Sequence, residues 1–181
     1  KLDKDLVGAC FGLGTSLYAQ NKAAEALPIF EALSQRTDDW GAYAREYLAA
    51  CLYDLGRFDR AILLLQDILA KQPQDAANRW LLAKSLYKTK RYSEALGFFR
   101  SVAAEDASRQ EAALYYEAVC LEQLGRTREA EQAYRTISQG KTEWAHEARK
   151  AGAALVGKPY RVYLDFLGGY DTGIVKQGED S

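Results

Sequence analysis

The chain has 181 residues, of which 48% are hydrophobic and 27% charged, and its formal net charge is −1. That length allows one domain or a small repeat array, and the near-neutral charge without a basic run gives no electrostatic case for binding nucleic acid or an anionic membrane. No apolar stretch reaches the roughly eighteen residues of a transmembrane helix. Because the sequence begins at Lys1, with neither a signal peptide nor any Met, we expect it to be part of a longer protein.

The same residues return every 34 or 35 positions along the chain. Ala26 is followed by Ala61 after 35 residues, by Ala95 after another 34 and by Ala130 after another 35. A fixed period of this length, with several residues in phase, is the sequence signature of a helical repeat array. The chain is therefore expected to consist of successive helix pairs.

The first copy predicts two helices, at about residues 6–19 and 23–35. In the first helix, apolar residues recur at helical spacing and define an expected packing face. These residues are Leu6, Cys10, Leu13 and Leu17. Gly14 is small where a neighbouring helix must come close. In the second helix Pro28 lacks an N–H and crowds the carbonyl of Ala24, so we expect a kink or a late helix start.

The second copy, residues 42–73, predicts two helices folded around a tight turn at Gly56. The polar residues 37–39 offer capping side chains before its first helix. Gly56 is expected in the left-handed conformation, which Gly tolerates best at a helix end. Pro73 is expected to stop the second helix.

The third and fourth copies, at about residues 76–107 and 111–142, repeat this scheme. Glu117 stands where the other copies carry leucine, and because burying an unpaired carboxylate is costly, we expect it to be turned outward or paired. A further first-type helix at about 144–156 is followed by Gly and Pro before a partner helix can form. Such a lone last helix is expected to cap the open end of the array.

The repeats resemble the tetratricopeptide repeat over about residues 7–156. Each copy has a small residue where two helices cross, and each second helix has an alanine with a large apolar residue four positions later. The small residues are Gly14, Ala49, Ala83, Ala118 and Gly152. The resemblance implies an all-α fold over residues 1–157: a right-handed α-solenoid of about four helix pairs plus a capping helix, whose first helices line a concave groove.

Residues 158–181 form a tail of a different character. From Tyr160 to Leu167 the side chains alternate between the two faces of an expected β-strand, and glycines and Ile174-Val175 then predict a turn and a second short extended segment. One interpretation is a hairpin or a disordered end, and the other is the first strand of a β-barrel. The run LGGYDTGIV resembles the opening strand of bacterial outer-membrane proteins with periplasmic tetratricopeptide domains, but Thr172 and Gly173 replace the usual Ser and Asn.

Catalytic and metal-binding patterns find little support in the sequence. The single histidine, His146, is interpreted as a solvated residue near a helix start, and there is no second histidine for a zinc-protease motif. The cysteines Cys10, Cys51 and Cys120 lack a CxxC spacing and are interpreted as buried small hydrophobic residues. We therefore expect no catalytic residue, no cofactor, no metal and no enzymatic activity.

The resemblance implies that exposed inner positions of the first helices form a binding groove rich in aromatic side chains. Aromatic residues provide large contact area and are enriched at binding hot spots. The candidate groove residues are Phe11, Tyr18, Tyr43, Glu46, Tyr53, Trp80, Lys84, Tyr87 and Tyr115. In the competing interpretation, several of these tyrosines pack between neighbouring repeats. The lysine and asparagine set by which chaperone-binding members hold a terminal carboxylate is absent.

Three functional hypotheses follow. In the first, the chain is a scaffold that binds a peptide, a protein or an extended chain such as a polysaccharide, in the bacterial periplasm and tethered through residue 160 onward to an outer-membrane barrel for assembly or export. In the second, it is a cytosolic scaffold that organises a protein complex. In the third, it is the regulatory part of an enzyme whose catalytic domain lies elsewhere. No nucleic-acid partner is expected.

Overall fold

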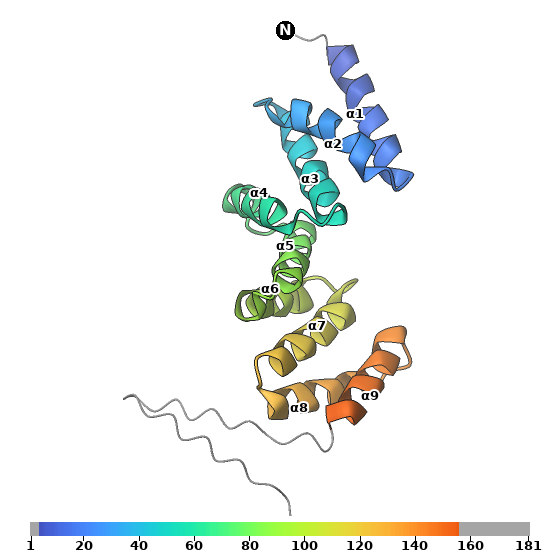
Figure 1. Cartoon of the computed structure of the whole chain (residues 1–181), viewed down its shortest axis with the longest axis vertical. Helices are drawn as coiled ribbons and strands as arrows, with labels where there is room; N and C mark the ends of the chain where they lie inside the picture. Colours follow the sequence, from blue (N-terminus) through green and yellow to red (C-terminus); the bar gives the residue numbers. More distant parts are fainter. Residues whose placement is uncertain (1–3, 156–181) are drawn as a thin grey trace, which may run out of the picture.

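The computed structural model describes residues 4–155, and these residues form nine α-helices (Figure 1). The helices are α1 (Lys4–Ala19), α2 (Ala23–Ser34), α3 (Asp39–Asp54), α4 (Phe58–Lys71), α5 (Ala76–Lys88), α6 (Tyr92–Glu105), α7 (Gln110–Gln123), α8 (Thr127–Ile137) and α9 (Glu143–Leu155). They pair as the sequence period predicts. The expected boundary at residue 157 and the extended segments of the tail lie outside the described residues.

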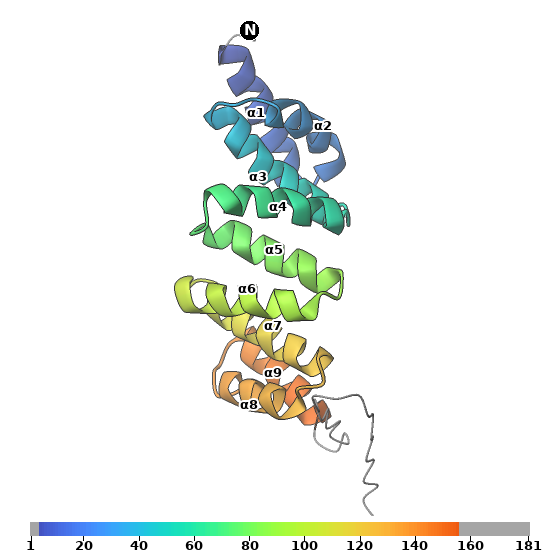
Figure 2. The ribbon, with the colours of Figure 1, turned by 90° about the vertical axis from the view of Figure 1, so that its left-hand side faces the viewer.

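Consecutive helices pack antiparallel and stack into a single curved rod, with α1 at one end and α9 at the other (Figures 1 and 2). Each helix contacts the next, and contacts also join α1 to α3, α3 to α5 and α7 to α9. This is the expected all-α, right-handed solenoid. None of the helices within residues 4–155 has both the length and the apolar character needed to cross a membrane.

The turn inside each of the four helix pairs has the same backbone conformation. Positive φ angles occur at Asn21, Gly56, Lys90 and Gly125. At each turn the N–H of the following residue donates to a carbonyl five residues earlier, as from Arg57 to Leu52 at 2.8 Å. This bond satisfies a carbonyl at the helix end and fixes the angle at which the chain turns back.

The helices of one pair pack closely because small residues lie at their crossings. A Cβ added to Gly14 would lie 2.9 Å from Cζ of Phe30, so a larger residue does not fit without movement of that ring. At the corresponding crossings Ala49, Ala83 and Ala118 are fully buried. The small-residue pattern of the sequence therefore marks real helix–helix contacts.

Side chains cap several of the first helices. Asp38 accepts a hydrogen bond from the backbone N–H of Gly41 at 3.2 Å, and Asp75 accepts one from Asn78 at 3.0 Å. Thr142 does the same for Ala145 at 3.2 Å. These contacts confirm the capping role predicted for residues 37–39 and define where each new repeat begins.

Three expectations for individual residues need correction. Of the two outcomes expected for Pro28, a kink or a late helix start, the late start does not occur, because the helix begins at Ala23 and continues through the proline. Leu6 and Leu13 of the expected packing face are 53% and 55% exposed. The reason is that the matching face of α3 is covered by the preceding helix α2, and no described helix precedes α1.

The third correction concerns the register of the last helix. Arg149 donates to the carbonyls of Ser138 and Gly140, as Arg45 of α3 does to Ser34 and Arg36, all 104 residues earlier. By the same offset of 104 residues Gly152 corresponds to Leu48, whereas the repeat pattern had aligned it with Ala49. Gly152 accordingly faces α8, where an added Cβ would lie 3.4 Å from Cβ of Tyr134.

Candidate functional site

The odd-numbered helices line the inner side of the curved rod (Figure 1). The candidate groove residues all come from four of them: α1, α3, α5 and α7. The structure brings these residues into three groups along the concave face: a first aromatic cluster at α1–α3, a central platform at α3–α5, and a second aromatic cluster at α5–α9.

The first aromatic cluster is centred on a ring stack between α2 and α3. The rings of Phe30 and Tyr47 are nearly parallel, with centroids 5.1 Å apart. Phe11 meets both rings edge-on, at 5.8 and 5.5 Å, and Tyr18 meets Tyr47 at 5.8 Å. Tyr43 is 53% exposed and touches the cluster through Phe11 at 6.4 Å. Phe11 and Tyr18 therefore serve helix packing, while Tyr43 presents most of its surface to solvent.

The second aromatic cluster has the same design and extends further. Phe99 and Tyr116 stack at 5.2 Å, and Trp80 contacts both rings, at 5.5 and 5.7 Å. Tyr87 contacts Tyr116 at 5.5 Å. Tyr115 continues the cluster toward the end of the array through Trp144 of α9, at 5.3 Å. Most candidate rings of this region thus hold neighbouring repeats together, as the competing interpretation expected.

The central platform consists of Tyr53, Lys84 and Trp80. The Lys84 ammonium lies over the ring of Tyr53, 4.5 Å from its centroid, and 6.0 Å from that of Trp80. Burial lowers the pKa of Lys84, and nearby Asp54 acts in the opposite direction. Burial also raises the pKa of Tyr53 to about 12, so its hydroxyl stays protonated and can donate a hydrogen bond at neutral pH.

An acidic margin lies beside the platform on α3. Glu46 is half-buried, and this burial, together with the negative charge of Asp75, raises the pKa of its carboxyl group. Asp54, the residue after Tyr53, is exposed, and its negative charge raises the pKa of both Tyr53 and Lys84. The middle of the concave face therefore combines an aromatic ring, a partly desolvated cation and two carboxylates.

Tyr47 and Tyr116 are central to the two clusters but were not among the predicted residues. They lie between the inner face and the packing face of their helices, so the repeat pattern alone did not select them. The sequence does contain one signal for them. The stacked pair Phe30 and Tyr47 recurs 69 residues later as the stacked pair Phe99 and Tyr116. This two-repeat period is not visible when each repeat is compared only with the next one.

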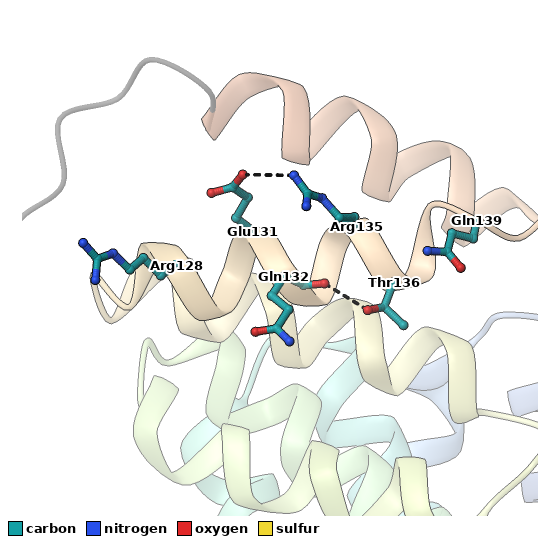
Figure 3. Close-up of a pocket in the computed structure, with 6 residues that line it drawn as sticks. All are labelled: Arg128, Glu131, Gln132, Arg135, Thr136 and Gln139. Carbon is teal, nitrogen blue, oxygen red and sulfur yellow. Dashed lines mark hydrogen bonds and ion pairs between the residues drawn. The ribbon is translucent and has the colours of Figure 1, made fainter.

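A shallow hollow of about 450 Å³ lies along the outer side of α8 (Figure 3). Its lining residues are Arg128, Glu131, Gln132, Arg135, Thr136 and Gln139. Glu131 and Arg135 pair at 3.8 Å, and Thr136 donates to the carbonyl of Gln132 at 3.0 Å. Because these side chains come from one helix and its end, the hollow is a feature of the helix surface and not a cleft between elements.

The described residues offer little for catalysis. Within residues 4–155 no group of three or more His, Cys, Asp or Glu side chains is arranged to hold a metal ion. Burial raises the pKa of Cys51 to about 11 and that of Cys120 to about 12, so both thiols are protonated and poor nucleophiles at neutral pH. His146 is exposed.

Comparison with known protein families gives one match. The family model described as anaphase-promoting complex, cyclosome, subunit 3 matches residues 19–102 and 67–137, which together cover more than half of the chain. No curated protein matches the chain in sequence.

Several solved structures have the same arrangement of helices. MamA 41-end from Desulfovibrio magneticus RS-1 is 15% identical with a TM-score of 0.67, over 83% of this chain and 90% of that one. MamA AMB-1 is 20% identical with a TM-score of 0.71, over 86% and 85%. A putative kinesin light chain with TPR-like repeats from Podosopora anserina is 16% identical with a TM-score of 0.65, over 86% and 87%. At these identities the likeness shows the fold alone.

Proposed function

The chain belongs to the tetratricopeptide-repeat family whose model is described as anaphase-promoting complex, cyclosome, subunit 3, and from this premise we propose that it is a non-catalytic scaffold binding a segment of a protein partner along its concave face. The curved stack of first-type helices supports this proposal because it presents side chains from successive repeats along one continuous surface.

The main support for this proposal is the arrangement of side chains in the central platform. In the two aromatic clusters, ring faces are largely engaged with other rings of the chain. At Tyr53, by contrast, the ring face meets a lysine side chain from the next repeat, 4.5 Å away. Such a cation–π contact is weak at a partly exposed site, about 0.5–1 kcal/mol, so a partner side chain can replace it at little cost.

A protein segment is the partner that these residues fit best. Tyr53 and Trp80 offer ring surface, Lys84 offers a donor for backbone carbonyls or carboxylates, and Glu46 and Asp54 offer acceptors for backbone N–H groups or cations. Extended peptide carries all of these groups within a few residues. Aromatic residues next to charged ones are also typical of interface hot spots.

Selection from a displayed library of random dodecapeptides tests this proposal. Peptides selected on the unaltered chain should bind at least about tenfold more weakly to Tyr53→Leu and to Lys84→Gln, which is about 1.4 kcal/mol. Lys88→Gln is the matched control, because Lys88 lies one turn further on α5 and is exposed. Its affinity should stay within about twofold of the unaltered chain.

Two outcomes contradict the proposal. One is that no peptide is enriched, or that the selected peptides bind both platform variants as tightly as the control. The other is that soluble β-linked glucans, added to the same assay, bind the chain in place of peptides and lose affinity in Tyr53→Leu. That result indicates a polysaccharide partner.

The cellular setting is a separate proposal, supported by the sequence alone. We propose that the array lies in a bacterial periplasm and is joined through residue 160 onward to an outer-membrane barrel, where it serves assembly or export of surface proteins or polysaccharide. The support is the alternation from Tyr160 to Leu167 and the run LGGYDTGIV. The cytosolic scaffold is the second candidate, and attachment to a catalytic domain is the third.

The full gene fused to a reporter that is active only in one compartment distinguishes these settings. Activity of a periplasm-specific reporter, together with a downstream region of alternating strands, is expected from the first. Activity of a cytosol-specific reporter contradicts it and supports the second, and a downstream catalytic domain supports the third.

A further inference from the structure

Four ring contacts of the first aromatic cluster recur in the second after 69 residues. Phe30 and Tyr47 stack at 5.1 Å with 16° between the rings, and Phe99 and Tyr116 stack at 5.2 Å with 13°. The edge contacts correspond as well. They are Phe11–Phe30 and Trp80–Phe99 at 73° and 70°, Phe11–Tyr47 and Trp80–Tyr116 at 86° and 73°, and Tyr18–Tyr47 and Tyr87–Tyr116 at 83° and 71°. The structural unit is thus two repeats long.

The junction between α4 and α5 lacks this ring stack. Its residues at the equivalent positions are Leu65, which is 35 residues after Phe30, and Leu81, which is 34 residues after Tyr47. Among residues 4–155, ring–ring contacts link α2 to α3 and α6 to α7, whereas none links α3 or α4 to α5. At the positions of the stacked rings this junction therefore carries two leucines.

At the same junction, the arginine of α5 does not hydrogen-bond to the end of the preceding helix, although its counterparts in α3 and α9 do. Arg45 donates back to carbonyls at the end of α2, and Arg149 donates back to carbonyls at the end of α8. Arg79 takes the position of Arg45 in α5, but its main partner is Glu105 in the following helix α6, with Ser101. Its one side-chain hydrogen bond in the direction of α4 is to the connecting loop, at Oε1 of Gln74 and 3.2 Å.

From these observations we infer that the α4–α5 junction is the joint of the array. Residues 4–71 and 76–155 form two blocks, each held together by ring stacks and arginine bonds. The two blocks are joined by aliphatic contacts that allow sliding, because such contacts have no preferred direction. Across the concave face the blocks meet at the contact between Lys84 and Tyr53. A change of angle at the joint therefore opens or closes the groove at this contact.

Hydrogen exchange of the backbone amides, followed by mass spectrometry on the full chain, tests the joint. The three junctions compared are residues 31–44, 66–78 and 100–113, which occupy the same place in successive repeats. Residues 66–78 are expected to exchange at least about tenfold faster than the other two segments. Equal protection of all three segments overturns the inference, as does exchange of the whole array in one cooperative step.

Exchanging the side chains between junctions supplies a second test. Leu65→Phe with Leu81→Tyr installs the missing stack and should slow exchange of residues 66–78. Phe99→Leu with Tyr116→Leu, the reverse change, should speed exchange of residues 100–113 to the rate of the natural joint. If the first pair does not fold, the reverse pair still decides, because unchanged exchange at 100–113 contradicts the role given to the stack. Neither readout involves a partner, so it is independent of the proposed function.

Discussion

At the scale of single residues, the turns inside the helix pairs show one backbone conformation that three different residue types adopt. Gly56 and Gly125 adopt positive φ without steric cost, whereas Asn21 and Lys90 do so with side chains. For a residue other than glycine, left-handed backbone costs about 1–2 kcal/mol. Lys90, at φ 62°, is therefore a point of local strain that the hydrogen bonds of the turn maintain.

Exchanging the residues at these turns should change stability in opposite directions. Lys90→Gly is expected to raise the free energy of unfolding by about 0.5–1 kcal/mol, because relief of strain outweighs the added freedom of the unfolded chain. Gly56→Ala is expected to lower it by about 1 kcal/mol, since φ is 72° there. Urea unfolding followed by circular dichroism measures both. A loss of stability in Lys90→Gly contradicts this account of the turn.

Asp106 provides a pH-dependent contact at the end of α6. Hydrogen bonds from Ser108 and Arg109 lower the pKa of its carboxyl group from 3.8 to about 2. A carboxyl group with a lowered folded-state pKa adds stability above its ordinary pKa, and this stability is lost as the pH falls through the folded value. Between pH 4 and 2 the Asp106→Asn variant should therefore lose less stability than the natural chain. Parallel declines of the two proteins contradict this assignment.

At the scale of elements, the close approach of α1 and α2 depends on Gly14. Replacing it by Ala places Cβ 2.9 Å from Cζ of Phe30 and should lower the free energy of unfolding by about 1–3 kcal/mol. Gly12 is the matched control on the same helix, because an added Cβ there meets nothing within 4 Å. Gly12→Ala should raise stability by about 0.5–1 kcal/mol through helix propensity. Equal effects of the two changes rule out a packing role for Gly14.

The sequence predicted the elements well because their determinants are local. Helical spacing, capping residues and turn glycines lie within one repeat, and the 34-to-35-residue period then placed every described helix. Glu117 shows the limit. The pattern allowed an outward or a paired carboxylate, and the structure pairs it with Nε of Arg100 at 2.7 Å, a partner 17 residues away in the preceding helix. Contacts of this kind depend on how two repeats are turned relative to each other.

At the scale of the whole molecule, the candidate groove residues lie on the helices that the repeat pattern selected, but their roles depend on packing. The ring of Trp80 contacts Phe99 from its own helix pair and Tyr116 from the next pair, so much of its surface packs inside the array. Tyr53 has only Phe58 as a ring neighbour within residues 4–155 and meets Lys84 on the concave face. Sequence period predicts which face a residue occupies, but it does not predict how much of its ring other repeats cover.

The two-repeat unit gives the array an uneven distribution of stiffness. Ring stacks lie at α2–α3 and α6–α7, and the aliphatic joint lies between them at α4–α5. The central platform spans this joint, so the surface proposed for binding is also the part of the groove where the two blocks meet. A bound segment that contacts both sides would hold the blocks at one angle.

Binding at the concave face is tested most directly by NMR, which follows the amide resonances of the isotope-labelled chain as a selected dodecapeptide is added. We expect the largest shifts in α3 and α5, around Tyr53, Trp80 and Lys84, and no shift for residues on the outer side such as Leu63 of α4. Shifts confined to the outer surfaces of α4, α6 and α8, with none in α3 and α5, contradict the claim that the concave face is the binding surface.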